Sequence, residues 1–349
     1  MGIAGIGRMG WVHAQHLLEL EREEGVCRLA AVVDVDGAKL ERFVAKTGFT
    51  GRTFLSIEEY IQADVCKATM IVTPTAMHRD HASILVKAGH RVISEKPLTG
   101  TLEGDLEFCA ELDRDAPNGV MLAFQRRFDA ALVYGRELMH SGAIGRVVKV
   151  YSALEDSGPA PNGYASGGIL PDMSVHNVDE ILWLTDKMPD RAMAIGSRVY
   201  SHALTTCDED FDDASLYMWF GEDLLAQVQV SRNHVSGYRV ETVIFGDQGQ
   251  IQIGHFFQRP DEIIVEAFGR RGKMEPIARR SFPGGIGEPG APEFVERFGP
   301  AYKAEAAAFI DCCRRGVAFP ATHNDGLRAQ KVISAGMRNA LTKANGSEI

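Results

Sequence analysis

The sequence predicts two domains: an α/β domain built on a parallel β-sheet, followed by an α+β domain with an antiparallel sheet. In the first third of the chain, short β-branched apolar runs alternate with helical patterns, which is typical of a parallel sheet. From about Tyr151 onward, apolar and polar residues alternate with a period of two, which predicts antiparallel strands. A chain of 349 residues is long enough for two hydrophobic cores. We expect the domains to cover residues 1–124 and 125–349.

The elements of the first domain follow a repeated β-α-β order. Five strands are expected, at Gly2–Ile6, Leu29–Val35, Thr69–Thr73, Arg91–Ser94 and Gly119–Phe124. Helices are expected at Met9–Arg22, at Gly37–Lys46, near Ser56, at His78–Ala88 with Gly89 as C-cap, and at Leu102–Arg114. This order predicts right-handed crossover connections between neighbouring parallel strands.

The elements of the second domain are fewer and more widely spaced. Strands are expected at Leu216–Phe220, Leu225–Val230 and Val240–Phe245, and helices at Val175–Leu184, Pro300–Arg314 and Gly326–Leu341. A loop rich in glycine and proline, residues 281–294, precedes the long helix. It is short enough to be a local excursion rather than a linker between domains.

Composition excludes several classes of partner. A formal net charge of -10 argues against nucleic acid and against an anionic membrane surface, because both select for clustered Lys and Arg. A small or neutral ligand fits better. The six cysteines form no C-x-x-C pair and are expected as reduced thiols: Cys27, Cys66, Cys109, Cys207, Cys312 and Cys313. No run approaches the roughly 20 apolar residues of a membrane helix, and we expect a cytoplasmic protein.

A glycine-rich loop joins the first expected strand to the first expected helix. It reads Gly5-Ile6-Gly7-Arg8-Met9-Gly10, a G-x-G-x-x-G pattern, and the next strand ends in Asp34. Glycines let backbone N–H groups approach a pyrophosphate at a helix N-terminus, and an acid at this spacing reaches the adenosine ribose. The combination predicts a doubly wound, dinucleotide-binding Rossmann domain. The alternative is a tight turn in an unrelated doubly wound fold, with Asp34 as a strand-end cap.

The acid at the end of the second strand also bears on the choice of cofactor. Asp34 would accept hydrogen bonds from both ribose hydroxyls and would repel a 2′-phosphate, so NAD is favoured over NADP. Asp36 and Arg8 weaken this preference.

A lysine follows the strand Arg91–Ser94, in the sequence Glu95-Lys96-Pro97. Ligands of open parallel sheets bind at the carboxyl ends of the strands, and residues 73–78 follow the neighbouring strand on the same edge. We therefore expect Lys96 to face the nicotinamide end of the cleft, where its ammonium stabilises the alkoxide of a reacting alcohol. The peptide bond before Pro97 is one where the cis form can occur. The alternative is a lysine that simply faces water.

Three further polar residues are spaced for one face of a helix. Asp172, His176 and Asp179 are separated by four and three residues. An imidazole beside carboxylates can accept a proton from a substrate hydroxyl near neutral pH. In this hypothesis Asp172 orients His176, and Asp179 binds another hydroxyl. The alternatives are a metal site, for which no further ligand motif is present, and a capping Asp with a core His.

With these residues in place, the chain resembles the glucose-fructose oxidoreductase / inositol dehydrogenase (Gfo/Idh/MocA) family, and most of all its inositol 2-dehydrogenases. The E-K-P and D-x-x-x-H elements are the most specific signals, and "RFGPAYKAE" favours the inositol branch. The segments that carry the resemblance are residues 73–82, 94–100, 124–129, 172–181, 236–241, 297–311 and 324–332.

The resemblance implies a fold and a set of roles. It implies a Rossmann domain followed by an α+β domain whose open-faced, mainly antiparallel sheet mediates homodimers or homotetramers. It implies Lys96 and His176 as catalytic residues, with His176 as general base and Asp172 beside it. Substrate-binding positions are Lys96, Asp172, His176, Asp179, Arg126 and Tyr238. Besides the glycine loop, Asp34 and Lys96, the cofactor positions are Thr73, Pro74, His78, Glu95 and Gln125.

The resulting hypothesis is an NAD-dependent dehydrogenase, without metal, that oxidises a secondary hydroxyl of a cyclic polyol, myo- or scyllo-inositol. The segment of residues 155–168 differs from the inositol enzymes in length and composition, which leaves the substrate open. One alternative is therefore an aldose dehydrogenase or keto-sugar reductase of the same family. An alternative of another class is a non-catalytic NAD-binding regulator, which would have lost the catalytic residues.

Overall fold

The computed structural model describes residues 1–160, 166–198, 210–254, 262–270, 275–284 and 292–340. These residues fold as two units, each with its own sheet. Unit 1 comprises Met1–Gln125 and Ala301–Leu327, and unit 2 comprises Arg126–Pro300 and Arg328–Ile349. The second stretch of unit 1 is helical, so a late part of the chain completes the first unit.

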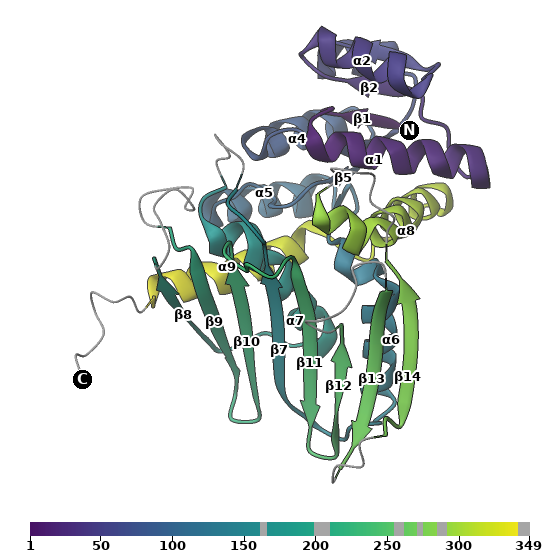
Figure 1. The fold of residues 1–349 in the computed structure, drawn as a ribbon. Helices are drawn as coiled ribbons and strands as arrows, with labels where there is room; N and C mark the ends of the chain where they lie inside the picture. The colour runs from purple at the N-terminus through teal and green to yellow at the C-terminus, as the bar shows by residue number, and fades with distance from the viewer. Residues whose placement is uncertain (161–165, 199–209, 255–261, 271–274, 285–291, 341–349) are drawn as a thin grey trace. The chain divides into compact units, whose positions relative to one another are not determined.

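A six-stranded parallel sheet forms the centre of unit 1 (Figure 1). Its order, β3-β2-β1-β4-β5-β6, is that of a doubly wound Rossmann fold, which confirms the predicted class. The strands are β1 Gly2–Ala4, β2 Ala31–Val33, β3 Arg52–Phe54, β4 Ala68–Ile71, β5 Arg91–Ser94 and β6 Val120–Leu122. Sequence analysis missed β3, because Arg52 and Thr53 are polar and exposed at the edge of the sheet.

Helices α2, α3 and α5 of unit 1 begin at residues whose side chains accept backbone hydrogen bonds. Asp36 caps α2, Ser56 caps α3 and Thr101 caps α5. The helices are α1 Arg8–Glu19, α2 Gly37–Thr47, α3 Ile57–Ala63, α4 His78–Lys87 and α5 Leu102–Asp115. Helix α1 continues as a π-helical turn, Leu20–Glu24, and ends at Gly25 in the left-handed conformation. A short 3-10 turn, η2 Thr75–Met77, precedes α4.

An eight-stranded sheet forms the centre of unit 2, in the order β14-β13-β12-β11-β7-β10-β9-β8. Only the pair β7 and β10 is parallel, so the sheet is mixed and mainly antiparallel, as predicted. The strands are β7 Val147–Glu155, β8 Arg191–Ser197, β9 Asp213–Phe220, β10 Leu224–Ser231, β11 Arg239–Gly246, β12 Gly249–Ile253, β13 Glu262–Gly269 and β14 Ala278–Pro283.

One face of this sheet is covered by helices. Helix α6, Ala130–His140, packs on β12, β13 and β14, and α7, Val175–Thr185, packs on β7 and β10 (Figure 1). Two short turns lead into these helices: the 3-10 turn η3, Gln125–Phe128, and the π-helical turn η4, Leu170–Ser174. Alternate residues of β9 are buried, which is typical of a strand with one covered face.

The two last helices correct the predicted boundaries. Helix α8 covers Glu293–Arg315, so it begins earlier than the predicted start at Pro300, which lies inside it. Proline is frequent at the first position of a helix, but this proline lies further inside α8. Helix α9 covers His323–Arg338, and the predicted end at residue 341 lies outside the described residues.

The described ranges contain neither a membrane-spanning helix nor a disulfide bond. No helix in them has both the length and the apolar character that crossing a membrane requires. Five cysteines are described there and all are free: Cys27, Cys66, Cys109, Cys312 and Cys313. Cys207, which was also expected as a reduced thiol, lies outside these ranges.

Arg91, the first residue of β5, contacts the C-terminal end of α8 and the residues that follow it. Its Nη1 donates to the Cys312 carbonyl at 2.7 Å and its Nη2 to the Val317 carbonyl at 2.5 Å. Its guanidinium also lies 4.0 Å from the centre of the Phe319 ring. A cation at the end of a helix satisfies carbonyls that have no partner within the helix. Arg91 therefore couples β5 to the late segment of unit 1.

We expect Arg91→Met to lower the free energy of unfolding by about 1–3 kcal/mol, because two carbonyls lose charged donors. Urea unfolding followed by circular dichroism measures the change. The matched control is Arg114→Met, because Arg114 is exposed and pairs with its neighbour Asp115, and that change should be within about 0.5 kcal/mol of wild type. Equal effects of the two substitutions would contradict the role of Arg91.

Candidate active site

The glycine loop has a backbone that other residues could not adopt. Gly5 has φ +93°, and a Cβ on Gly10 would lie 1.9 Å from the Gly5 carbonyl oxygen. A Cβ on Gly7, in contrast, would meet nothing within 4 Å. Helix α1 begins directly after Gly7, which offers no side-chain cap to its first N–H groups. Open space in front of uncapped helical N–H groups fits the pyrophosphate of a dinucleotide.

Asp34 lies at the end of β2, beside the glycine loop. Its Oδ2 accepts a hydrogen bond from the Ile6 N–H at 2.8 Å, and its Oδ1 accepts one from the Asp36 N–H at 2.9 Å. Asp36 itself caps α2 through the N–H groups of Ala38 and Lys39. The structure therefore gives the two acids different tasks: Asp36 begins a helix, and Asp34 is fixed against the loop.

The turn that carries Lys96 is held by a buried histidine. His13 of α1 is 1% exposed, and its Nε2 lies 2.7 Å from Glu95 Oε1. The other oxygen of Glu95 accepts the backbone N–H of Lys96 at 3.1 Å. Burial disfavours the charge of Glu95, but the hydrogen bond and charge of His13, with Lys96 and His78, outweigh it and keep its pKa below the ordinary value. The Lys96–Pro97 peptide bond is cis.

A second histidine joins the two loops on this edge. His78 Nε2 lies 2.8 Å from the Thr73 carbonyl oxygen, and its Nδ1 lies 2.9 Å from the Pro97 carbonyl oxygen. His78 is 2% exposed. Its buried imidazole therefore holds together the loop that follows β4 and the loop that follows β5. Pro74, in the first of these loops, is exposed.

Gln125 follows β6 on the same edge, and its Nε2 donates to the Tyr302 hydroxyl at 3.4 Å. The Tyr302 ring meets the His13 ring edge to face, with centroids 5.4 Å apart. Tyr302, in the late segment of unit 1, therefore contacts Gln125, which is predicted to line the cofactor site, and His13, which holds Glu95. The cofactor residues predicted in unit 1 all follow strands β1, β2, β4, β5 and β6, whose carboxyl ends share one edge of the parallel sheet.

In unit 2, the predicted continuous helical face is interrupted. Asp172 lies in the π-helical turn η4, whereas His176 and Asp179 lie in α7. The three-residue spacing of His176 and Asp179 therefore holds as predicted, but the α-helical spacing does not extend to Asp172. Single π-helical turns of this kind occur often at functional sites. His176 and Asp172 are both half-buried.

Asp172 has a partner that sequence analysis did not single out. Arg232, directly after β10, is 1% exposed and its Nη2 lies 3.2 Å from Asp172 Oδ2. The same guanidinium lies 3.8 Å from Asp210 Oδ2 and 3.5 Å from the Ser166 hydroxyl. Because Ser166 belongs to the segment of residues 155–168, that segment reaches the Asp172 cluster. Residues 161–165 of it lie outside the described ranges.

Two consecutive arginines pair with two consecutive acids of α7. Arg126 Nη1 lies 2.6 Å from Glu180 Oε2, and Arg127 holds Asp179 through Nε at 2.9 Å and Nη2 at 2.6 Å. The pairs fix η3 to α7. The sequence signal was the doublet "RR" in η3 with "DE" in α7, but spacing along the chain does not reveal which charges pair. The Tyr238 hydroxyl is a neutral donor near neutral pH, because burial and the Asp156 charge raise its pKa.

No set of three His, Cys, Asp or Glu side chains within the described ranges is arranged to hold a metal ion. The residues that sequence analysis missed hold predicted site residues or their neighbours in place. They are His13, Tyr302, Glu180, Arg127, Asp210 and Arg232. Besides the two doublets, a sequence signal existed for His13, which lies one helical turn after Gly10.

Comparison with known proteins places both units. Residues 1–121 match the family model described as an oxidoreductase family with an NAD-binding Rossmann fold, and residues 133–252 match the GFO/IDH/MocA C-terminal domain. Inositol 2-dehydrogenase of Rhizobium meliloti is 28% identical over 98% of this chain and 97% of its own length. The scyllo-inositol 2-dehydrogenase (NAD(+)) of Bacillus subtilis is 26% identical over 90% of this chain and 86% of its own.

A solved structure has the same fold over nearly the whole chain. The scyllo-inositol dehydrogenase of Lactobacillus casei, with bound NAD(H) and scyllo-inositol, has a TM-score of 0.80 and 26% identity, and the match covers 97% of this chain and 96% of that one. The glycine loop and the matching model of an NAD-binding Rossmann fold agree on the cofactor, NAD. The chain is therefore an NAD-dependent oxidoreductase of the GFO/IDH/MocA family.

Proposed function

We propose that this chain oxidises one secondary hydroxyl of a cyclic polyol, myo- or scyllo-inositol, to the corresponding ketone. The C–H bond breaks and its hydride passes to NAD, the O–H bond loses its proton to His176, and a C=O bond forms. The proposal is supported by one observation in each unit. In unit 1, the carboxyl edge of the parallel sheet ends in Glu95 and Lys96, and this edge is the proposed cofactor half-site. In unit 2, η4 and α7 carry Asp172 and His176, and they are the proposed substrate half-site.

NAD supplies the hydride acceptor when it is bound, and the chain supplies the rest. Lys96 donates a hydrogen bond to the substrate oxygen and stabilises the negative charge that develops as the proton leaves. His176 accepts the proton, and Asp172, held by Arg232, stays beside it as a fixed charge. Arg126 and Tyr238 donate to other ring hydroxyls, and Asp179 accepts from one. The names of the relatives, inositol dehydrogenases, favour a ring polyol as substrate.

A sugar is the second candidate, and one observation favours it. We expect the segment of residues 155–168 to differ from the inositol enzymes, and Ser166 near its end lies next to the Arg232–Asp172 pair. An aldose or keto-sugar would contact the same proton-transfer residues, and the segment of residues 155–168 would shape the edge of its binding site. A panel of inositols and aldoses assayed with NAD distinguishes the two candidates by the ratio of kcat/KM.

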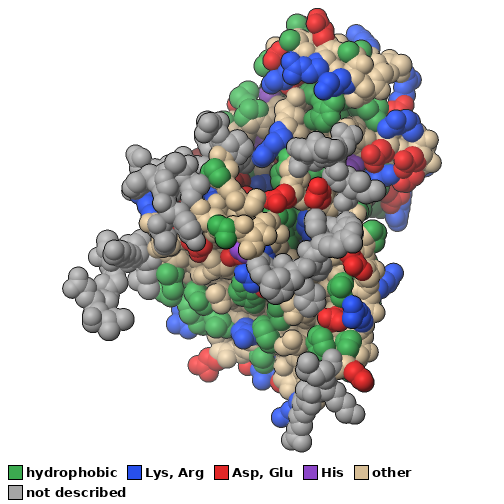
Figure 2. Space-filling view, viewed as in Figure 1, with side chains coloured by type: hydrophobic (Ala, Val, Ile, Leu, Met, Phe, Trp, Pro, Cys, Tyr) green, Lys and Arg blue, Asp and Glu red, His purple; other side chains and the backbone are tan. Residues whose placement is uncertain are grey.

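The outer face of the unit 2 sheet supports a homo-oligomer, dimer or tetramer. Figure 2 shows hydrophobic side chains across the face of the sheet that α6 and α7 leave uncovered. Ile195 of β8 is 42% exposed there, and Tyr217 and Trp219 of β9 point to the same side. An exposed apolar face of this kind is typical of a protein–protein interface. Sedimentation velocity should give a multiple of the monomer mass, and a monomer would contradict the proposal.

A reducing, cytoplasmic location fits the free cysteines.

Asp34 should determine the preference for NAD over NADP. We expect Asp34→Ser to weaken NAD binding by about tenfold or more, because the carboxylate that accepts hydrogen bonds from the ribose hydroxyls is lost. NADP should bind better, because the repulsive charge is gone and Lys39, 3.9 Å from Asp34, can pair with the 2′-phosphate. Titration calorimetry with both cofactors measures the ratio. Asp36→Ser is the matched control, since it keeps an N-cap of α2, and an equal shift in that variant would contradict the role of Asp34.

Loss of either proposed catalytic side chain should slow turnover strongly, and loss of His176 should leave the cofactor site intact. We expect His176→Ala and Lys96→Met to lower kcat by about a hundredfold or more, because proton transfer and alkoxide stabilisation are lost. NAD affinity of His176→Ala should equal that of wild type. NADH absorbance follows the reaction, and His140→Ala, an exposed histidine of α6, is the control.

Two results would overturn the proposal. One is full activity of His176→Ala. The other is a wild-type protein that binds NAD tightly but oxidises no member of an inositol and aldose panel, which is the behaviour of a non-catalytic regulator.

A further inference from the structure

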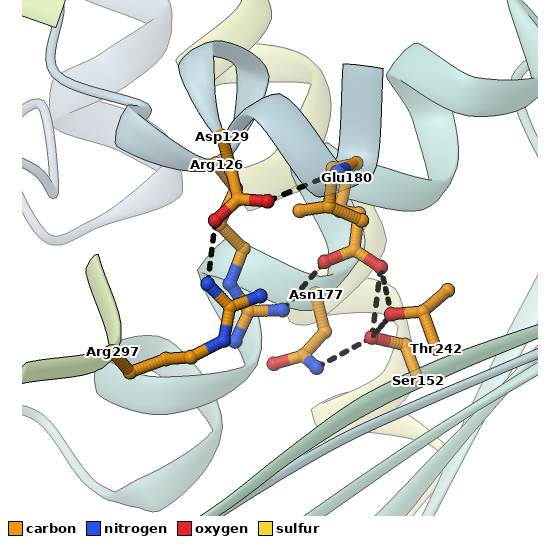
Figure 3. Close-up of polar contacts among 8 residues, drawn as sticks. Arg126, Asp129, Ser152, Asn177, Glu180, Thr242 and Arg297 are labelled. Carbon is orange, nitrogen blue, oxygen red and sulfur yellow. Dashed lines mark hydrogen bonds and ion pairs between the residues drawn. The ribbon is translucent and has the colours of Figure 1, made fainter. Parts of the chain in front are cut away.

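A buried charged network lies between α7 and the centre of the unit 2 sheet (Figure 3). Its central group is the carboxylate of Glu180, which is 0% exposed. Oε2 pairs with Arg126 Nη1 at 2.6 Å. Oε1 accepts hydrogen bonds from the hydroxyls of Ser152 at 3.1 Å and Thr242 at 2.5 Å. Ser152 and Thr242 are directly paired residues of the neighbouring strands β7 and β11, so the carboxylate is fixed to the sheet.

The hydrogen bonds of this network run in one direction. Asn177 Nδ2 donates to the Ser152 hydroxyl at 2.7 Å, and Ser152 donates to Glu180. Thr242 and Arg126 donate to Glu180 as well. The Glu180 carboxylate thus receives only donors, and the Arg126 guanidinium faces it as a charged partner. The network therefore holds a full ion pair in the interior of unit 2.

Arg126 uses only part of its donor set for Glu180. Its Nε and Nη2 are buried and have no hydrogen-bond partner among the described residues. The guanidinium is 1% exposed and lies 5.3 Å from the centre of the Phe298 ring, which offers no acceptor atom. Buried donors without acceptors are costly and rare. Because the guanidinium is planar, the bond from Nη1 to Glu180 also fixes the directions of the Nε and Nη2 donors.

We propose that Glu180 is a positioning residue that aims the Nε and Nη2 donors of Arg126 at the substrate. The ligand chemistry that matches two parallel N–H donors is a pair of neighbouring oxygen acceptors, such as vicinal hydroxyls of a ring polyol. This inference rests on the proposed function and deepens it. His176 and Glu180 are one helical turn apart in α7, so one helix carries both the proton acceptor and the anchor of the hydroxyl donor. The spacing between reacting and recognised hydroxyls is thereby built into α7.

The test compares the polyol KM of Glu180→Gln with that of a matched substitution in another buried ion pair. Glu180→Gln keeps the volume but removes the charge, and should raise the KM for the polyol by about tenfold or more while the KM for NAD stays the same. Asp129→Asn is the control, because Asp129 pairs with Arg297 Nη1 at 2.5 Å in the same unit and is also buried. It should lower the melting temperature without raising the KM for the polyol. An unchanged polyol KM in Glu180→Gln, or an equal rise in Asp129→Asn, overturns the inference.

A second background separates positioning from general stability. In Arg126→Met, the addition of Glu180→Gln should raise the polyol KM no further, because the donors to be aimed are gone. Independent, multiplying effects of the two substitutions contradict a role through Arg126. If Glu180→Gln does not fold, Thr242→Val removes one donor to the carboxylate and should raise the KM by a smaller factor, whereas an unchanged KM contradicts the inference.

Crystal structures of wild type and Glu180→Gln decide the question without turnover. We expect the Arg126 guanidinium to rotate or shift in the variant, whereas an unmoved guanidinium overturns the inference. If wild type oxidises no polyol, the proposed function fails by itself, and the position of Arg126 in the two crystals still tests whether Glu180 fixes it.

Discussion

Buried charge is the constraint on which the polar architecture of both units depends. A charged side chain is stable away from water only where a partner replaces its hydration. Each residue proposed for chemistry here is next to such a pair. His13 with Glu95 stands behind Lys96, and Arg232 with Asp172 stands beside α7. His13, Arg232 and Glu180 are almost fully buried, so these supports fix the directions of the side chains that they contact.

The two units meet this constraint in different ways. Unit 1 uses backbone geometry: the parallel sheet brings several strand ends to one edge, and Gly5 and Gly10 let the loop close against itself. Unit 2 uses side chains, because its mainly antiparallel sheet has no common carboxyl edge. Paired arginines and acids, together with the π-helical turn η4, take over the positioning. The proposed cofactor residues are therefore brought together mainly by the backbone of the parallel sheet, whereas those of the substrate half-site are held by side-chain ion pairs.

Sequence patterns predicted features that depend on a few neighbouring residues, but they missed ion pairs between residues far apart in the chain. The glycine loop, the strand that ends in Asp34 and helix α7 were predictable, because turn geometry and apolar periodicity act over a few residues. The edge strand β3 was missed because its residues are polar and exposed. The start of α8 was predicted at Pro300, but the helix begins at Glu293 and Pro300 lies inside it.

The ion pairs of the substrate half-site had no local signature. Arg126 and Glu180 are 54 positions apart in the chain, and only the packing of η3 on α7 selects this pair from the many charges available. Asp172 was expected on the face of a regular helix, but a π-helical turn shifts it relative to His176. Hydrogen bonding in such a turn responds to tertiary packing, so spacing in the sequence does not reveal it.

The central claim is that Lys96 and His176 act on the same oxygen of one substrate carbon beside the nicotinamide ring. A crystal structure of the ternary complex with NADH and a ring polyol tests it most directly. The account predicts Lys96 Nζ and an imidazole nitrogen of His176 both within about 3.2 Å of one hydroxyl oxygen, with the hydrogen on its carbon directed at the nicotinamide. A complex in which the two side chains contact different hydroxyls, or in which either lies away from the polyol, would contradict it.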